Sequence, residues 1–380
     1  MIQSTATRTM LFALLFLLLT PLQAAIEVPP PKVKAAGHIL VDYHSGNVLA
    51  ENNADKRLEP ASLTKIMTAY VLFHELKEQT IKLEDMVTIS EHAWRMPGSR
   101  TFVEVGKQIP LKVLLMGMII QSGNDASVAL AEHVAGTEEN FANVMNTHAK
   151  RLGLTGSHYV NATGLPHADH YTTARDLATL TAATVRDFPD YYEWYAVKSF
   201  EYNKIKQYNR NKLLWRDSTV DGVKTGYTEA AGYCLVASAK KNDARMISVV
   251  LGTTSTKVRA KESQALLTYG FHFFETRKLY AAGQPLSKIR VWKGDKPSVE
   301  VGPSEDLFVT VPRRQFDKVK PEMHLMERIE APISKGQKVG DVKIMLKDKV
   351  IKTTPIVAFD DVAEGGFFSK MKDGMLLWME

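Results

Sequence analysis

Apolar side chains between residues 60 and 188 recur at the spacing of helices. From Pro60 to Leu76 they return every three or four residues, which predicts a helix with an apolar face. Residues 111–120 are apolar nearly all round, as expected of a helix buried at the centre of a domain. The same period predicts three further helices, over residues 125–134, 138–152 and 172–188.

On both sides of this helical region the apolar residues alternate with a period of two, which is typical of strands. Residues 38–43 and 48–51 flank the turn residues Ser45-Gly46-Asn47 and predict a hairpin. Three later strands and a closing helix are predicted over residues 220–224, 232–239, 246–252 and 256–275. Strands at both ends with helices between them indicate an α+β domain, in which the hairpin joins the later strands.

From about Pro285 the pattern changes to short alternating segments between clusters of Gly, Pro and Asp. This is typical of a small all-β domain, and we expect a sandwich. The predicted strands cover residues 289–292, 299–301, 307–311, 327–330, 342–346 and 349–357. No pairing of a nucleophile with a base occurs in this part of the sequence, so the chemistry is expected in the first domain.

The first 25 residues have the composition of a secretory signal. Arg8 is the only early charge, an unbroken apolar run covers residues 10–19, and Ala24 and Ala25 offer small residues for cleavage. The run is shorter than the about 20 apolar residues that a membrane span needs. We therefore expect export and cleavage, with an uncleaved anchor as the alternative.

The last residues of the chain form a second amphipathic segment. Polar side chains, among them Ser369 and Asp373, lie away from a helical stripe made of Phe367, Phe368, Met371, Met375, Leu376, Trp378 and Met379. The segment is far shorter than a span, which predicts an interfacial helix on a membrane surface; the alternative is packing on the β domain. These patterns divide the chain into a signal peptide (residues 1–25), an α+β domain (26–284), a β sandwich (285–363) and a tail (364–380).

Composition adds few constraints. A chain of 380 residues with 45% hydrophobic and 24% charged residues is globular and long enough for two domains. The formal charge of +6 is modest and no dense basic block occurs, so we expect no nucleic-acid partner. The single cysteine, Cys234, excludes an intramolecular disulfide and lies in an apolar strand-like run, which predicts a buried thiol.

Three short motifs follow one another along the first domain: Ser62-Leu63-Thr64-Lys65, Ser122-Gly123-Asn124 and Lys224-Thr225-Gly226. Each motif alone is a weak indication of function, because similar patterns recur at residues 45–47, 238–241 and 369–372. The order and settings of the first set provide the signal: the first opens an apolar helix, the second follows a long apolar run and the third precedes a strand-like stretch. The same trio, with Ser-Asp-Asn in the middle, occurs in penicillin-binding proteins and class A β-lactamases.

The first motif has the residues of an activated nucleophile. A serine hydroxyl reacts slowly unless a neighbouring base takes its proton. Lys65, one helical turn from Ser62, can do so only as a neutral amine, which burial and a nearby cation such as Lys224 would favour. The N–H of Ser62 at a helix start would suit an oxyanion hole. The structural alternative is a helix-capping serine beside a solvated lysine.

The other two motifs suit a proton relay and a substrate site. Ser122 would relay a proton, and the Asn124 amide would hold a substrate amide carbonyl. Gly226 would let a substrate backbone approach the strand closely, while Lys224 and Thr225 would bind a carboxylate. The structural alternatives are a turn between helices, capped by Asn124 or the following aspartate, and an edge strand protected by a lysine.

Together, the motifs resemble those of the low-molecular-mass penicillin-binding proteins, and more narrowly the D-alanyl-D-alanine carboxypeptidases of the five/six type. The resemblance covers essentially the whole mature chain. Further family-like segments are Pro60-Ala61, Gln121, Asn209-Arg210-Asn211, Leu214-Trp215, Asp221-Gly222-Val223 and Gly270-Phe271-His272-Phe273-Phe274-Glu275. The resemblance implies a β-lactamase-like transpeptidase domain, with an antiparallel sheet between helices and a helical subdomain. A small all-β sandwich would follow it.

The resemblance also implies roles for individual residues. Ser62 is similar to the family's acyl-ester nucleophile, Lys65 to its general base, and Ser122 belongs to its second motif. The backbone N–H groups of Ser62 and Tyr227 would form the oxyanion hole, although close relatives often have His where this chain has Tyr227. The substrate-binding residues would be Asn124, Lys224, Thr225, Gly226, Tyr227, Arg210 and Arg259.

The implied substrate is a peptidoglycan stem peptide that ends in D-Ala-D-Ala, and the implied inhibitors are β-lactam antibiotics. No metal or other cofactor is expected. The enzyme would work in the periplasm, peripherally bound to the outer face of the inner membrane through its tail.

Four alternatives stay open at this point. A class A β-lactamase needs a Glu-x-x-x-Asn loop, which residues 161–180 lack. A D,D-endopeptidase would share the motifs, and a wall-binding protein without activity would not need them intact. Metal binding by His167, Asp169 and His170 is weaker, because no H-E-x-x-H pattern occurs. We attach no function to the glycosylation sequon at Asn161.

Overall fold

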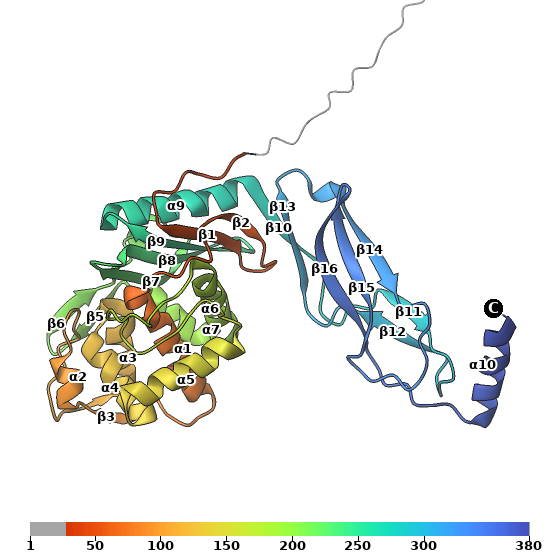
Figure 1. The fold of residues 1–380 in the computed structure, drawn as a ribbon, viewed down its shortest axis with the longest axis horizontal. Coiled ribbons are helices and arrows are strands. Elements are labelled where there is room, and N and C mark those ends of the chain that lie inside the picture. The colour runs from red at the N-terminus through yellow and green to blue at the C-terminus, as the bar shows by residue number, and fades with distance from the viewer. Residues whose placement is uncertain (1–27, 380) are drawn as a thin grey trace, which may run out of the picture.

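The structure, a computed structural model, describes residues 28–379, so the predicted signal peptide lies outside the described residues. Figure 1 shows two bodies: an α+β domain with nearly all the helices, and an elongated all-β domain that ends in α10 (Phe367–Met379). Within the described range, no helix has both the length and the apolar content needed to cross a membrane.

A five-stranded antiparallel sheet lies at the centre of the first domain, in the order β2-β1-β9-β8-β7. The N-terminal hairpin pairs with β9, as the sequence predicts; Ile39 lies opposite Val249. β7 forms one edge of the sheet, which matters for the site below. The strands are β1 (Gly37–Asp42), β2 (Val48–Asn52), β7 (Val220–Thr228), β8 (Gly232–Lys241) and β9 (Ala244–Thr253).

Helices cover both faces of this sheet because successive side chains of a strand point to opposite faces. Val249 belongs to the core shared with α6 (Ala174–Asp187), whereas its neighbour Val250 packs with α9 (Thr256–Phe273). Figure 1 shows α9 alone above the sheet and the other large helices below it. The predicted closing helix over residues 256–275 ends two residues early, since the chain turns into strand β10 at Phe274.

The helical region is built around α1 (Lys65–Lys77). Ten of its 13 residues are buried, so it is the central helix, and the predicted single apolar face is wrong. The run at 111–120, predicted as the central helix, is α3 (Leu111–Met116) followed by a π-helical turn at Gly117–Gln121. The remaining elements are α2 (Glu91–Arg95), α4 (Asn124–Ala135), α5 (Glu138–Arg151), α7 (Pro189–Tyr192), α8 (Leu213–Arg216) and the strand pairs β3 (Met86–Thr88) with β4 (Gln108–Pro110) and β5 (Ser199–Tyr202) with β6 (Ile205–Tyr208).

The second domain is a sandwich of two sheets around one apolar core, as predicted. The smaller sheet pairs β10 (Phe274–Tyr280), which precedes the predicted boundary at residue 285, with β13 (Leu307–Pro312). The larger sheet has the order β11 (Ser287–Arg290), β12 (Ser298–Gly302), β16 (Lys349–Ala358), β15 (Lys338–Leu346) and β14 (Val319–Leu325).

One predicted strand of this domain is wrong. Residues 327–330 form no strand; only Glu330 makes an isolated bridge, to Trp292. The strand is β14 instead, at the edge of the sheet, where the side chains from Lys320 to His324 are all exposed. An edge strand with both faces in solvent needs no apolar alternation, so periodicity could not detect it.

Candidate active site

Ser62 lies in a 3-10 turn (Ala61–Thr64) that leads directly into α1, and not on the α-helix itself. The spacing of three residues still brings the two side chains together: Lys65 Nζ lies 3.3 Å from Ser62 Oγ. Ser62 is partly exposed, whereas Lys65 is only 1% exposed. The lysine is therefore not the solvated first-turn residue of the structural alternative.

Lys65 has two further partners. Its Nζ donates to Asn124 Oδ1 and to the backbone carbonyl of Thr163, each at 2.7 Å. The pKa of Lys65 is lowered to about 7: burial is the largest cause, the cation of Arg210 acts in the same direction, and the carboxylates of Glu138 and Asp125 oppose both. Arg210 thus adds to the effect of burial, and Lys224, the cation that the sequence analysis proposed, also interacts with this amine, because Lys65 lowers the pKa of Lys224 and the repulsion between two charges is mutual.

Ser122 ends the π-helical turn in the left-handed conformation, with φ of +69°. Its hydroxyl is buried and has no hydrogen-bond partner among the residues that the structure describes. A buried hydroxyl without a partner is costly in a folded protein unless water or a bound molecule satisfies it. Asn124 follows at the first position of α4, where its Nδ2 donates to Pro97 O at 2.7 Å.

Asp125 is a positioning residue that the sequence analysis named only as a helix cap. Its buried carboxylate accepts the backbone N–H groups of Thr101 at 2.7 Å, Phe102 at 2.9 Å and Val103 at 3.3 Å. It therefore holds the loop before β4 against the second motif. The signal in the sequence was an aspartate directly after Ser-Gly-Asn at a helix start, which is a residue type that accepts backbone N–H groups.

Lys224 and Thr225 are buried on the edge strand β7, and Lys224 Nζ donates to Thr225 O at 3.1 Å. Burial lowers the pKa of Lys224 well below its usual range, and the cations Lys65, Arg210 and Arg259 add to this. Such a concentration of positive groups is unfavourable in an empty site and becomes favourable when an anion binds.

Gly226 also has a role in packing. A Cβ at this position would lie 3.0 Å from Pro60 O and 3.1 Å from Ala61 Cβ. The glycine thus lets β7 pack against the turn that carries Ser62, and the predicted approach of a substrate backbone stays a prediction. The third motif is held next to the first by this contact.

The two arginines reach the strand from different elements. Arg259 of α9 donates to Gly226 O at 2.9 Å and lies over the Tyr233 ring. Arg210 is exposed, in a loop tied to β7 because Asn211 Nδ2 donates to Gly222 O at 2.9 Å.

Tyr227 is 51% exposed and its ring packs on Tyr233, with centroids 4.3 Å apart. This side chain, which the sequence analysis singled out as a departure from close relatives, therefore faces solvent beside the site. Cys234 is buried as predicted, and burial raises the pKa of its thiol to about 11.

The repeated motifs lie outside the site. Ser238 accepts a hydrogen bond from Arg245, and Ser369 donates to Gly294 O near the C-terminus. Of the residues weighed above as an alternative metal site, His170 is buried and contacts Thr64 Oγ1 and the N–H of Val160. The described residues bring a different trio together, His74, Glu75 and His148, but Arg151 donates to His148 Nδ1, which disfavours a cation there.

Comparisons with known proteins agree with this geometry. The family model "D-alanyl-D-alanine carboxypeptidase" matches residues 24–255, and the model "Penicillin-binding protein 5, C-terminal domain" matches residues 274–364. The architecture and the matched residues define a serine peptidase of the penicillin-binding class. The chain belongs to the D-alanyl-D-alanine carboxypeptidase family.

Three relatives illustrate the similarity. The chain is 46% identical over 366 residues to the D-alanyl-D-alanine carboxypeptidase DacC of Escherichia coli, covering 94% of this chain and 92% of DacC. Penicillin-binding protein 5 of Haemophilus influenzae has a TM-score of 0.86 at 43% identity, covering 89% of this chain and all of that structure. Penicillin-binding protein D2 of Listeria monocytogenes, solved with ampicillin bound, has a TM-score of 0.60 at 27% identity, covering 64% of this chain and all of that structure.

Proposed function

We propose that this enzyme, a serine hydrolase of the carboxypeptidase family, removes the terminal D-Ala from peptidoglycan stem pentapeptides through an acyl-enzyme on Ser62. One observation carries the proposal. A neutral lysine amine has two N–H groups and one lone pair. Asn124 Oδ1 and Thr163 O accept the two N–H groups of Lys65, each at 2.7 Å, which leaves the lone pair for the Ser62 hydroxyl at 3.3 Å.

Acylation would begin when Ser62 Oγ attacks the carbonyl carbon of the penultimate D-Ala and Lys65 takes the hydroxyl proton. The oxyanion would accept hydrogen bonds from the N–H groups of Ser62 and Tyr227. As the C–N bond breaks, the proton that Lys65 took would pass through the Ser122 hydroxyl to the leaving amine of D-Ala, which leaves Ser122 a hydroxyl and Lys65 a neutral amine again. Its buried hydroxyl without a partner supports this role.

Deacylation would use the same base. With D-Ala gone, water would attack the ester of Ser62 while Lys65 takes its proton. The tetrahedral intermediate would then return the Ser62 hydroxyl and release the shortened peptide. A β-lactam would acylate Ser62 in the same way.

Specificity for a free C-terminus would come from the positive groups around β7. The substrate carboxylate would meet Lys224 and Thr225, with Arg210 and Arg259 nearby. Lys224 is strongly disfavoured as a cation in the empty site, and an arriving carboxylate would raise its pKa and pair with it.

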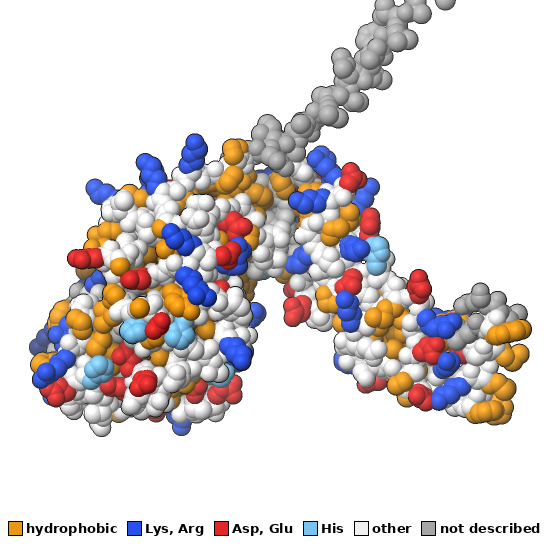
Figure 2. All heavy atoms as spheres, in the orientation of Figure 1, with side chains coloured by type: hydrophobic (Ala, Val, Ile, Leu, Met, Phe, Trp, Pro, Cys, Tyr) orange, Lys and Arg blue, Asp and Glu red, His pale blue; other side chains and the backbone are white. Residues whose placement is uncertain are grey.

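We further propose that the enzyme is exported by residues 1–25 and lies in the periplasm, bound through α10 to the outer face of the inner membrane. In α10, Phe367, Phe368 and Trp378 are highly exposed. Its polar face contacts the β domain, where Asp373 accepts from the N–H of Lys293 at 2.6 Å and pairs with Arg290. Both predicted alternatives for the tail are therefore compatible: polar contacts attach the helix while its apolar face stays free (Figure 2).

The test uses three compounds with the purified enzyme: a peptide that ends in D-Ala-D-Ala, the same peptide as its C-terminal amide, and penicillin. We expect D-Ala release from the free acid, little cleavage of the amide, and a long-lived penicilloyl adduct. Rapid penicillin turnover without D-Ala release would indicate a β-lactamase. Cleavage of a cross-linked dimer in preference to the pentapeptide would indicate an endopeptidase, and no reaction with any compound would indicate a wall-binding protein.

A further inference from the structure

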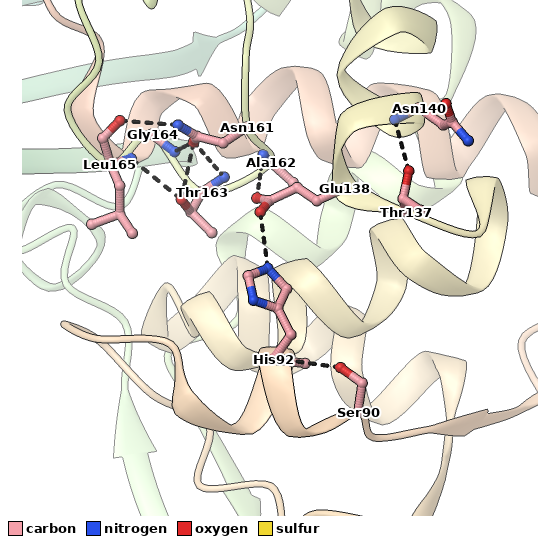
Figure 3. A network of polar contacts seen from close by, with 11 residues as sticks. Ser90, His92, Thr137, Glu138, Asn140, Asn161, Ala162, Thr163, Gly164 and Leu165 are labelled. Atoms are coloured by element: carbon pink, nitrogen blue, oxygen red, sulfur yellow. Dashed lines mark hydrogen bonds and ion pairs between the residues drawn. The ribbon is translucent and has the colours of Figure 1, made fainter.

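The carbonyl that accepts from Lys65 belongs to a turn, residues 161–165, that none of the three motifs includes. One side chain organises this turn. Asn161 Oδ1 accepts from Thr163 N at 3.1 Å, Thr163 Oγ1 at 3.0 Å and Gly164 N at 2.7 Å. Asn161 Nδ2 donates to Leu165 O at 3.0 Å (Figure 3). The backbone of the turn is therefore wrapped around Asn161.

A second side chain attaches the turn to the helices. Glu138, in the first turn of α5, accepts the Ala162 N–H at 2.9 Å, and its other oxygen lies 3.5 Å from His92 Nε2 of α2. Figure 3 shows the carboxylate between the turn and His92. The Glu138 side chain is 16% exposed and His92 59%, so the contact to the turn is the better shielded of the two.

The helices that carry these residues have well-defined starts. Thr137 caps α5 by accepting the N–H of Asn140 at 3.1 Å, and Ser90 caps α2 by accepting the N–H of Ala93 at 2.9 Å. Such caps fix the first turn of a helix, and Glu138 lies in that turn. The carboxylate is therefore presented to the turn from a rigid element.

On its other side, the turn touches the segment that carries the nucleophile. Gly164 has φ of +83°, and a Cβ there would lie 1.7 Å from Ala61 O. Any movement of the turn would thus change both its contact with residues 61–64 and the position of Thr163 O relative to Lys65.

We propose that Asn161 and Glu138 are positioning residues for the general base: they hold the turn at residues 161–165 so that the Thr163 carbonyl takes one N–H of Lys65 and directs the lone pair of Nζ at Ser62. The inference rests on the proposed role of Lys65 and extends it to residues outside the three motifs. Neither residue contacts the reacting atoms.

Glu138 also has an electrostatic effect, because its carboxylate favours the charged form of Lys65. The titratable and charged groups around the amine are Asp125, Glu138, His170, Arg210 and Lys224. Of these, Arg210 opposes the ammonium form, and the two carboxylates favour it. Removal of the Glu138 charge should thus lower the pKa of Lys65 and shift the acidic limb of activity to lower pH.

The geometric part is tested with Asn161→Ala, measured as the rate of acylation by a fluorescent penicillin at saturation and as peptide kcat and KM. We expect the acylation rate to fall about 100-fold, the loss that follows a displacement of about 1 Å in a catalytic group. KM should change little, because the turn does not touch the carboxylate site. Asn140→Ala is the matched control, since among the described residues its side chain bonds only to Ala135 O, at the end of α4.

The electrostatic part is tested with Glu138→Gln, which keeps an oxygen for the Ala162 N–H. We expect near-normal maximal activity. The acidic limb of the pH–activity profile should move to lower pH by roughly half a pH unit, the size expected for the loss of one charge that solvent partly screens. Glu138→Ala should lower the maximal rate as well. Thermal unfolding of each variant separates loss of positioning from loss of the fold.

Two outcomes would overturn the inference: an acylation rate of folded Asn161→Ala within twofold of the wild type, or an unchanged limb in Glu138→Gln. Lys65→Arg, measured alongside, separates the inference from the function on which it rests. If Lys65→Arg is active, the assignment of Lys65 as the base is wrong, and the proposed mechanism and the positioning role are then both wrong. If it is inactive while Asn161→Ala reacts normally, only the positioning role is wrong.

Discussion

At the scale of single residues, the proposed chemistry depends on the protonation state of Lys65. As an ammonium, Nζ would donate a third hydrogen bond to Ser62 Oγ and could not accept its proton. As an amine, it keeps both short contacts, to Asn124 and Thr163, and offers its lone pair to the serine. Burial is the largest cause of the lowered pKa, so in the proposed mechanism the packing of α1 at the centre of the domain prepares Lys65 to act as the base.

The first prediction concerns pH. Because the neutral form of Lys65 is required, acylation should be fast above about pH 7 and should fall as the pH drops through that value. This limb lies far below the pKa of a free lysine, about 10.4. Arg210→Ala removes a cation that disfavours the ammonium, so its limb should move to higher pH. The rate of pre-steady-state acylation at saturating penicillin, measured against pH, gives the position of the limb in the wild type and in Arg210→Ala. A wild-type limb near pH 10 would contradict the role of Lys65 as the base.

The second prediction concerns the nucleophile. Ser62→Ala should abolish covalent labelling by penicillin without lowering the melting temperature, because Ser62 is partly exposed and lies outside the core. Lys65→Arg should also be inactive, since an arginine does not lose its proton in a protein. Ser369→Ala, in a second S-x-x-K sequence, is the control and should label normally. Mass spectrometry of the labelled peptide identifies the serine; a label elsewhere than Ser62 would refute the assignment.

At the scale of elements, the site is the place where the start of α1, the turn before α4 and the edge strand β7 meet. An edge strand has unpaired backbone groups, which suits an extended peptide that adds to the sheet. Gly226 sets how closely β7 approaches the 3-10 turn at residues 61–64. The nucleophile and the positive groups of the third motif are thus brought together by packing between elements.

The third prediction tests this packing. In Gly226→Ala the new methyl group would meet the rigid carbonyl of Pro60 at 3.0 Å, so β7 must move away from Ser62. We expect kcat/KM for the peptide to fall by one to two orders of magnitude, about the effect of a displacement of 1 Å or less. Gly374→Ala in α10, where a Cβ meets nothing within 4 Å, should be without effect on kcat/KM. Wild-type kcat/KM in Gly226→Ala would show that this approach is unimportant.

At the scale of the whole molecule, the β domain connects the catalytic domain to α10. The two domains meet where the turn between β1 and β2 contacts β13: Ser45 Oγ lies 2.6 Å from Thr310 Oγ1. Lys352 Nζ of β16 donates to Ser45 O at 3.0 Å. The Ser-Gly-Asn sequence at residues 45–47 is therefore part of the junction between domains. Figure 1 places α10 at the opposite end of the β domain, far from the catalytic helices.

The fourth prediction concerns this end of the molecule. Deletion of residues 366–380 should move the enzyme from the membrane fraction to the soluble fraction and leave peptide hydrolysis in solution unchanged. Phe367→Ser with Phe368→Ser should have the same effect while the contacts of Asp373 stay intact. Sedimentation with anionic vesicles measures the binding. If the truncated enzyme stays with the membrane, the anchor is elsewhere, for instance an uncleaved N-terminal segment.

The sequence by itself determined the features that depend on neighbours along the chain. The periods of apolar residues located most helices and strands, and Ser62 and Lys65 meet because three residues make one turn. The order of the motifs indicated the family before any fold was known. Periodicity failed for β14, whose side chains are exposed on both faces, and for α1, whose burial depends on what surrounds it.

Only the tertiary structure decided the features that depend on contacts between distant segments. It identified Arg210 as a cation that lowers the pKa of Lys65, Pro60 as the neighbour of Gly226, and Thr163 as the second partner of the lysine amine. None of these pairs is close in sequence. In the sequence, Asn161 was only part of a glycosylation sequon to which we attached no function. Its proposed role in positioning the base rests on the fold, which places its turn against Lys65. The physical reason is that a side chain's pKa and orientation are set by the groups packed around it, whereas periodicity reports only which face is buried.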